Sequence, residues 1–350
     1  MKYLHVFNNE VKFSKDFLHF MKENSIDLEN HELFQYSEPD LDYQLIGLRN
    51  LFFSSWFSIT GFFVLCFRLH LNDRIMLHNL ASPALLLNLF LFPALIKKCY
   101  WHIWGKDLYY FQLLPKKYFH HHIYEYFRKF VFKRVKHVVT YVKGDFDLAK
   151  EWYQVDAEYH HCLMYPSNLF KCLKEKRIER FSKKVKILVG NSSDSGNNHE
   201  SIFKAISPYK EQDIELICPL SYGDTKNAQK VLKLGQQIFG NKFKPLVSFI
   251  PSDDYLNMLN ELHIAFFAHH RQQGMGNLIS LLSMGKKVYL KKNTTSFRLF
   301  SEIGLVVYDS SKFNLVKLSD NEANNNRQIA ASYFSQENYL SQLKSLYVNS

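Results

Sequence analysis

The sequence contains no apolar run of the length that a membrane-spanning helix needs, which is about 20 residues. The most apolar stretch, Leu51–Phe67, has 17 residues and is interrupted by four hydroxyl side chains and a glycine. Its helical spacing predicts one long helix over residues 45–67, which is buried or lies at a membrane interface. Whether this helix inserts into a bilayer stays open.

The sequence also has little cysteine. Its five cysteines are odd in number and lack the paired spacing of a zinc site or a disulfide framework, which indicates a reducing compartment. The amino terminus, MKYLHVFNN, reads as a first strand and lacks the basic start and apolar middle of a signal peptide. We therefore expect a cytoplasmic protein. The histidine triplet His120–His122 has no fourth ligand at a suitable spacing, so no metal site is predicted.

Positive charge and aromatic side chains are abundant. The formal net charge is +11, which favours an anionic partner such as nucleic acid, an anionic membrane surface or a phosphorylated substrate. Between Lys97 and Lys136 ten Lys or Arg residues face only two acids, and aromatic residues stand among them. This composition predicts docking on an anionic membrane surface. A nucleic-acid groove and a solvated helix face are the alternatives.

Strands and helices alternate along the chain, which is typical of α/β domains with parallel sheets. The pattern breaks at Pro166, and a basic segment follows. We predict an N-terminal acceptor-binding and membrane-docking domain over residues 1–166, a linker over 167–184 and a C-terminal nucleotide-sugar-binding domain over 185–334. A terminal helix over 335–350 is expected to cross back to the first domain.

The most informative segment is Leu262–Leu290, where an apolar strand is followed by a polar loop and an apolar helix. The loop and the start of the helix supply six candidate binding residues: Arg271, Gln272, Gln273, Gly274, Gly276 and Asn277. Glycines let the backbone approach a ligand closely, and free helix amides together with an arginine suit a phosphate. An ordinary strand-to-helix turn with solvated polar residues is the alternative.

A second loop of small residues follows the apolar strand Val185–Val189. Its members are Gly190, Asn191, Ser192 and Ser193. Their amides and hydroxyls suit a diphosphate, although turns use the same residues. Tyr222, which follows the strand Ile214–Cys218, is assigned to the same site. We predict that the donor diphosphate binds between this loop and the loop containing Arg271.

Two titratable residues near the end of another strand are candidate catalytic groups. The predicted strand Cys99–Ile103 presents His102 and Asp107 near its carboxyl end. Either could act as the general base that deprotonates a hydroxyl group. In the alternative, His102 hydrogen-bonds the backbone and Asp107 caps the helix that follows. Glu10 and His78, at neighbouring strand ends, are the next candidates.

Three strings closely resemble one protein family: YWHIWGKDLY, ILVGNSSDSGNNHE and FFAHHRQQGMGNLISLL, with shorter similarities at MYPSN and ENYL. They are similar to the bacterial TDP-Fuc4NAc:lipid II transferases of enterobacterial common antigen synthesis, glycosyltransferase family 56. The chain is identified as a divergent member, with the resemblance running from Ile75 onward. It implies a GT-B fold, in which two Rossmann-like α/β domains face each other across a cleft.

The resemblance also implies an activity. A peripheral protein on the cytoplasmic face of the bacterial inner membrane would transfer an N-acetylated deoxyhexose from a TDP-sugar to a polyprenyl-diphosphate oligosaccharide. The resemblance implies inversion of configuration at the anomeric carbon. We expect the reaction to need no metal or other cofactor, and we expect no nucleic-acid partner. Gln273 and Ser280 align with two glutamates by which many GT-B enzymes contact the donor sugar, so the identity of the sugar stays open. A nucleic-acid-binding protein and a non-catalytic relative are the competing interpretations.

Overall fold

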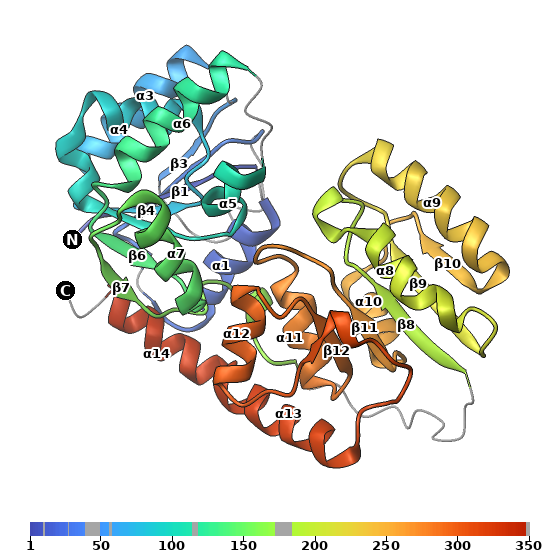
Figure 1. The fold of residues 1–350 in the computed structure, drawn as a ribbon. Coiled ribbons are helices and arrows are strands. Elements are labelled where there is room, and N and C mark those ends of the chain that lie inside the picture. Colours follow the sequence, from blue (N-terminus) through green and yellow to red (C-terminus); the bar gives the residue numbers. More distant parts are fainter. Residues whose placement is uncertain are drawn as a thin grey trace. The chain divides into compact units, whose positions relative to one another are not determined.

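The computed structural model describes residues 1–9, 11–26, 28–38, 50–55, 58–113, 118–171 and 184–347. The chain divides into two compact units (Figure 1). The N-terminal unit comprises Met1–Ser167 and Tyr339–Ser350, and the C-terminal unit comprises Asn168–Asn338. Each unit contains its own parallel sheet with helices packed on it. Most of the predicted linker, residues 172–183, lies outside the described residues.

The sheet of the N-terminal unit has the order β3-β2-β1-β4-β5-β6-β7 among the described residues, and all its pairs are parallel. The strands are β1 (Tyr3–Phe7), β2 (His31–Gln35), β3 (Asn50–Phe53), β4 (Arg74–His78), β5 (Cys99–His102), β6 (His137–Val139) and β7 (Glu158–His160). The helices are α1 (Val11–Glu23), α3 (Ile59–Leu71), α4 (Pro83–Leu91), α5 (Lys106–Leu113), α6 (Phe119–Phe132), α7 (Lys143–Tyr153) and α14 (Gln336–Tyr347).

The two faces of this sheet differ in chemistry. One face carries apolar side chains, both aliphatic and aromatic, and packs its core against α3, α4, α6 and α7. The opposite face carries histidines and aromatic residues, because side chains alternate between the faces along each strand. His5 contacts Phe17 of α1 there, and Tyr3 packs its ring against Tyr347 of α14. The last helix of the chain is therefore a structural part of the N-terminal unit.

The long helix predicted over residues 45–67 is wrong. Asn50–Phe53 forms β3, an edge strand paired in register with β2, and the helix begins only at Ile59. Ser58 separates the two elements, since its side chain accepts a hydrogen bond from the Gly61 amide and caps α3. Residues 45–49 lie outside the described residues.

The sheet of the C-terminal unit has the order β10-β9-β8-β11-β12-β13, again parallel throughout. The strands are β8 (Val185–Val189), β9 (Ile214–Pro219), β10 (Phe243–Leu246), β11 (Ile264–Phe266), β12 (Lys287–Leu290) and β13 (Tyr308–Asp309). The helices are α8 (His199–Ile206), α9 (Thr225–Phe239), α10 (Ser252–Asn260), α11 (Met275–Ser283), α12 (Thr295–Glu302) and α13 (Asp320–Tyr333).

Both sheets contain a topological switch point, where connections leave the sheet in opposite directions. In the C-terminal unit it lies between the paired strands β8 and β11, and in the N-terminal unit between β1 and β4. The carboxyl ends of strands at such a point form a crevice in which open α/β sheets bind ligands. These two edges are therefore the places at which to look for a site.

Candidate functional site

In the C-terminal unit the two loops predicted to bind a diphosphate flank the switch point. One follows β8 and the other follows β11, and these strands are neighbours in the sheet. Gly190 starts the first loop with a φ of +64°, and a Cβ atom there would lie 2.6 Å from Asn197 Oδ1. Glycine at this position meets both a conformational and a steric need.

The two loops touch each other. Gly274 is the N-cap residue of α11, and a Cβ atom there would lie only 3.1 Å from Asn191 Cγ of the first loop. Gly276 and Asn277 fall in the first turn of α11, so the free amides of that turn open next to the small-residue loop. Asn277 Nδ2 donates to the hydroxyl of Tyr255 at 3.2 Å.

Asn197 holds the site together and was not among the residues predicted from the sequence. It is fully buried, and its Nδ2 donates to Ser192 Oγ and to the Asp194 carbonyl, both at 3.1 Å. Its Oδ1 accepts from the Asn191 amide at 2.9 Å and from His269 Nε2 at 2.8 Å. One side chain thus ties the first loop to the residue that precedes the second loop.

Arg271 supplies a nearly buried cation, being 9% exposed. One guanidinium nitrogen, Nη1, donates to the carbonyl of Gln272 at 3.0 Å, and Nη2 lies 3.8 Å from Asp194 Oδ1. The two histidines beside it carry no charge near neutral pH. Burial, followed by the positive charge of Arg271, lowers the pKa of His269 to about 3, and burial lowers the pKa of His199 to about 4. The positive charge of the site therefore comes from Arg271.

Several buried polar atoms of these loops have no hydrogen-bond partner among the described residues. They are Asn191 Oδ1, Gln272 Oε1, Gln273 Oε1 and both ring nitrogens of His199. A buried polar atom without a partner costs about 1 to 3 kcal/mol. Such atoms gathered at one edge of a sheet indicate a place where a polar ligand completes the hydrogen bonding.

The structure brings the remaining predicted binding residues to the same edge. Ser193 donates through its amide and its hydroxyl to the carbonyl of Tyr222, at 2.9 and 2.7 Å. The Tyr222 hydroxyl lies 3.1 Å from Asn191 Nδ2 and accepts from it, while the residue as a whole is 58% exposed. Tyr222 therefore stands at the rim of the site, with its hydroxyl on the first loop.

In the N-terminal unit Asp107 is a buried carboxylate with four donors. It is 1% exposed and accepts from the Trp101 indole at 2.7 Å, the Trp104 and Leu108 amides at 3.0 Å and the Leu80 amide at 3.4 Å. Burial raises its pKa, while the Trp101 hydrogen bond opposes this shift. The capping alternative is met in part, because α5 already begins at Lys106 but the Asp107 carboxylate accepts from the Leu108 amide of its first turn. The role of Asp107 as general base stays a prediction.

His102 is equally buried. Its Nδ1 donates to the Tyr100 carbonyl at 3.2 Å, and burial lowers its pKa to about 3. A proton acceptor must reach the hydroxyl that it deprotonates, and the His102 ring is covered. Of the next candidates, Glu10 lies outside the described residues and His78 is fully buried.

His78 belongs to a buried chain of hydrogen bonds at the N-terminal switch point. The Trp104 indole, which can only donate, lies 2.6 Å from the Tyr165 hydroxyl, and this hydroxyl lies 2.6 Å from His78 Nδ1. His78 Nε2 lies 3.0 Å from His5 Nδ1, and His5 Nε2 lies 2.9 Å from His31 Nδ1, so the rings are joined by hydrogen bonds whose direction depends on the tautomers. Burial lowers the pKa of His5 and His78 well below the usual range, so both rings are neutral.

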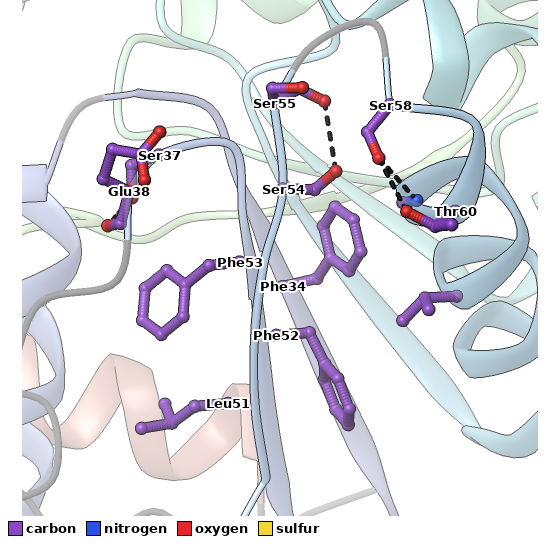
Figure 2. A pocket seen from close by; sticks show the side chains of 12 residues that line it. Phe34, Ser37, Glu38, Leu51, Phe52, Phe53, Ser54, Ser55, Ser58 and Thr60 are labelled. Atoms are coloured by element: carbon purple, nitrogen blue, oxygen red, sulfur yellow. Dashed lines mark hydrogen bonds between the residues drawn. The ribbon is translucent and has the colours of Figure 1, made fainter.

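A cavity of about 470 Å³ lies at the carboxyl ends of β2 and β3 (Figure 2). The close-up shows the phenyl rings of Phe34, Phe52 and Phe53 below a rim of hydroxyl groups. On this rim the Ser58 and Thr60 hydroxyls are 2.9 Å apart. Aromatic floors with hydroxyl rims offer both packing surface and hydrogen bonds to a small polar molecule.

The helix α3, which lines this cavity, and the helices α4 and α6 expose apolar side chains. α4 packs beside α3 on one side and beside α6 on the other. We call the following exposed residues the apolar face: Ile59, Phe63, Phe67 and Leu71 of α3, Leu87 and Leu91 of α4, and Phe119, Ile123 and Tyr126 of α6. Their spacing of three or four residues places them along one stripe of each helix. The exposed bases Lys129, Lys133 and Arg134 follow at the end of α6.

Among the described residues no helix combines the length and the apolar character needed to cross a bilayer.

The structure has the GT-B fold, and solved structures that share it include glycosyltransferases. HepE of Anabaena, solved with UDP, superimposes with a TM-score of 0.69 at 10% sequence identity over 100% of both chains. WaaG, a glycosyltransferase of lipopolysaccharide biosynthesis, superimposes with a TM-score of 0.64 at 11% sequence identity over 100% of both chains. A glycosyltransferase from Rickettsia africae superimposes with a TM-score of 0.62 at 15% sequence identity, over 100% of this chain and 99% of that chain.

The family comparison extends further toward the amino terminus than the resemblance of the three strings, which begins at Ile75. The family described as 4-alpha-L-fucosyltransferase glycosyl transferase group 56 matches residues 3–346. The first strands and helices of the N-terminal unit are therefore included in the match. By this match the chain belongs to glycosyl transferase group 56 and is a glycosyltransferase.

Proposed function

We propose that the C-terminal unit binds a nucleoside-diphosphate sugar between the loops after β8 and β11. The observation that carries this proposal is the set of buried, unpartnered polar atoms beside Arg271 at the switch point. The diphosphate takes the Arg271 guanidinium and the first amides of α11, which together favour an anion. HepE, a structural neighbour, was solved with UDP and with UDP-glucose.

The uncharged partners in the loop suit the sugar rather than the diphosphate. Gln272 and Gln273 carry buried side-chain oxygens that need hydrogen-bond donors, and sugar hydroxyl and amide groups supply such donors. Family membership and this chemistry support an acylamino deoxyhexose carried on TDP, as in TDP-Fuc4NAc. The Arg271 charge and the helix amides can hold the leaving diphosphate, so departure of the leaving group requires no metal.

Calorimetry with Arg271→Ala tests the donor site. Removing a charge-assisted contact costs about 1.5 to 3 kcal/mol, so the affinity for TDP should fall about tenfold to 150-fold. Arg298→Ala is the matched control, because Arg298 lies on the exposed face of α12 and pairs with Glu302 at 3.7 Å. Its affinity for TDP should equal that of the wild type.

Equal TDP affinity in Arg271→Ala and wild type would contradict the assignment of the diphosphate to this loop. If TDP binds as expected but mass spectrometry detects no transfer from a panel of TDP- and UDP-sugars, the protein is a non-catalytic relative. Transfer from one sugar of the panel identifies the donor.

We further propose that the acceptor is a polyprenyl-diphosphate oligosaccharide, reached from the cytoplasmic surface of the bacterial inner membrane. The apolar face of α3, α4 and α6 offers aromatic and aliphatic side chains for the interface, and the neighbouring bases attract anionic lipid. The cavity of Figure 2 lies beside α3 and can take a sugar of the acceptor next to its lipid.

Sedimentation with vesicles of phosphatidylglycerol and phosphatidylethanolamine tests this docking. The variant Phe63→Ser/Phe67→Ser should bind these vesicles at least about tenfold more weakly, since each ring contributes on the order of 2 kcal/mol when buried in lipid. Val316→Ser changes an equally exposed apolar residue of the C-terminal unit and serves as control. Wild-type protein that stays in the supernatant at low salt would overturn the proposal.

A further inference from the structure

A group of metal-ligand side chains lies at an edge of the N-terminal sheet, on the strands that follow β5 in the sheet order. His137 is the first residue of β6, and Glu158 and His160 lie on its parallel neighbour β7. The register pairs His137 with Glu158, so the three side chains project from one face of the sheet. Two imidazoles and one carboxylate form a donor set typical of zinc.

The three donor atoms are already arranged around one point. His137 Nδ1 lies 3.1 Å from His160 Nε2 and 3.4 Å from Glu158 Oε2, and the last two atoms are 3.8 Å apart. A point just off their plane lies about 2.0 to 2.1 Å from all three atoms, which is the length of zinc bonds to nitrogen and to carboxylate oxygen. The ion would require little rearrangement of these side chains.

The surroundings hold the ligands and leave an entry path. The His137 ring stacks on Tyr100 with 4.2 Å between centroids, which fixes its orientation. Glu158 is 66% exposed, so solvent and ions reach the group. The nearby positive charge of Arg74 opposes binding of a cation at this group.

We propose that His137, Glu158 and His160 bind one divalent transition-metal ion of the zinc type, with water completing the coordination. The ion joins β6 to β7, which is a three-residue strand at the edge of the sheet. This role is structural and independent of sugar transfer. In the competing arrangement no ion binds, and the two rings share a proton in a hydrogen bond next to Glu158.

The sequence could not indicate this site. Its two histidines are 23 residues apart and belong to different strands, so no short spacing joins them. The histidine triplet His120–His122 is more conspicuous in the sequence and can bind metal ions weakly at the surface. It must be removed before the binding at the edge site can be measured.

Titration calorimetry with Zn²⁺ tests the proposal in full-length protein whose three residues His120–His122 are changed to alanine. We expect one ion per chain, and we expect binding to weaken at least about tenfold in His137→Ala/His160→Ala and in Glu158→Gln. His161→Ala, which removes a neighbouring histidine outside the group, should bind as the background does. Co²⁺ should give the visible absorption of a four-coordinate ion in the background protein alone.

The variants also separate binding from folding. Glu158→Gln changes an exposed side chain and leaves the strand intact, so it remains informative if the double histidine variant does not fold. Zn²⁺ should raise the unfolding temperature of the background protein, and the same Zn²⁺ concentration should raise it less in Glu158→Gln. Equal Zn²⁺ affinity in the background and in Glu158→Gln, or no binding in the background, would overturn the proposal.

Discussion

The two units use the same architectural position in different ways. At the C-terminal switch point small residues and backbone turns leave polar atoms buried without partners among the described residues, beside one arginine. At the N-terminal switch point the same space is filled by large rings, and each hydrogen bond leads to the next from Trp104 to His31. A satisfied network stabilises its own unit, whereas unsatisfied atoms need a ligand.

The comparison teaches that a strand-end position alone does not make a catalytic residue. His102 ends β5 at the edge where α/β enzymes bind ligands, yet it is stacked on His78 with 4.4 Å between ring centroids and is covered. Burial has made it part of the support of the sheet. We call the buried rings from Trp104 to His31, together with His102, the closed network, and the loops around Arg271 the open site.

Acidification should weaken the closed network most. His5, His78 and His102 have pKa values lowered by burial, so the unfolded chain binds more protons than the native unit below about pH 6.5. Stability is therefore lost as the pH falls. When the pH falls from 7 to 5.5, each ring should lower the free energy of unfolding by about 1 kcal/mol, and the three rings together by about 3 to 4 kcal/mol.

Urea unfolding at the two pH values measures this loss, and hydrogen exchange of the native protein shows whether it falls on β1, β4 and β5. The protection factors of amides in these strands should fall at pH 5.5, and added TDP should not prevent this fall, because we propose that the nucleotide binds the other unit. Equal protection at pH 7 and pH 5.5 would show that the rings are accessible to protons in the native state.

Asp107→Asn should destabilise the N-terminal unit by about 3 kcal/mol. The amide oxygen of asparagine can replace only one of the two carboxylate oxygens. Its NH₂ group takes the place of the other oxygen, where two N–H donors then lose their acceptor. The urea midpoint of the variant measures the cost. Asp156→Asn, at a largely exposed aspartate paired with Lys136, is the control and should stay within about 0.5 kcal/mol of wild type.

This variant also decides between the two roles of Asp107. The structural role predicts lost stability, with turnover retained by the fraction that is folded. Wild-type stability with abolished turnover would instead identify Asp107 as the base.

Gly190→Ala should cost about 2 kcal/mol in the C-terminal unit and also abolish tight TDP binding. The left-handed backbone disfavours alanine. The new methyl group would also displace Asn197 Oδ1, which would lose its hydrogen bonds from the Asn191 amide and from His269 Nε2. Gly240→Ala is the control, since φ is +55° there and a Cβ would meet no atom within 4 Å. It should lose stability yet bind TDP normally, and weak binding in both variants would contradict a local effect.

The sequence predicted the strands that carry the site and the two loops, because buried strands followed by glycine-containing loops are local patterns. It failed where partners come from distant segments. Asn197 resembles any loop asparagine until its four contacts are seen, and the covering of His102 depends on the packing of other elements. The strand β3 was missed because a short apolar run fits a helix and an edge strand equally well.

The placement of α14 has a consequence for how the protein is made. Tyr339 donates its buried hydroxyl to the Met164 carbonyl at 2.7 Å, and the Tyr347 ring packs on Tyr3, so the N-terminal unit contains the first and last described elements of the chain. A ribosome releases α14 only after the whole C-terminal unit has emerged. The N-terminal unit is thus completed only after the C-terminal unit has been synthesised, and the C-terminal unit can finish folding before it.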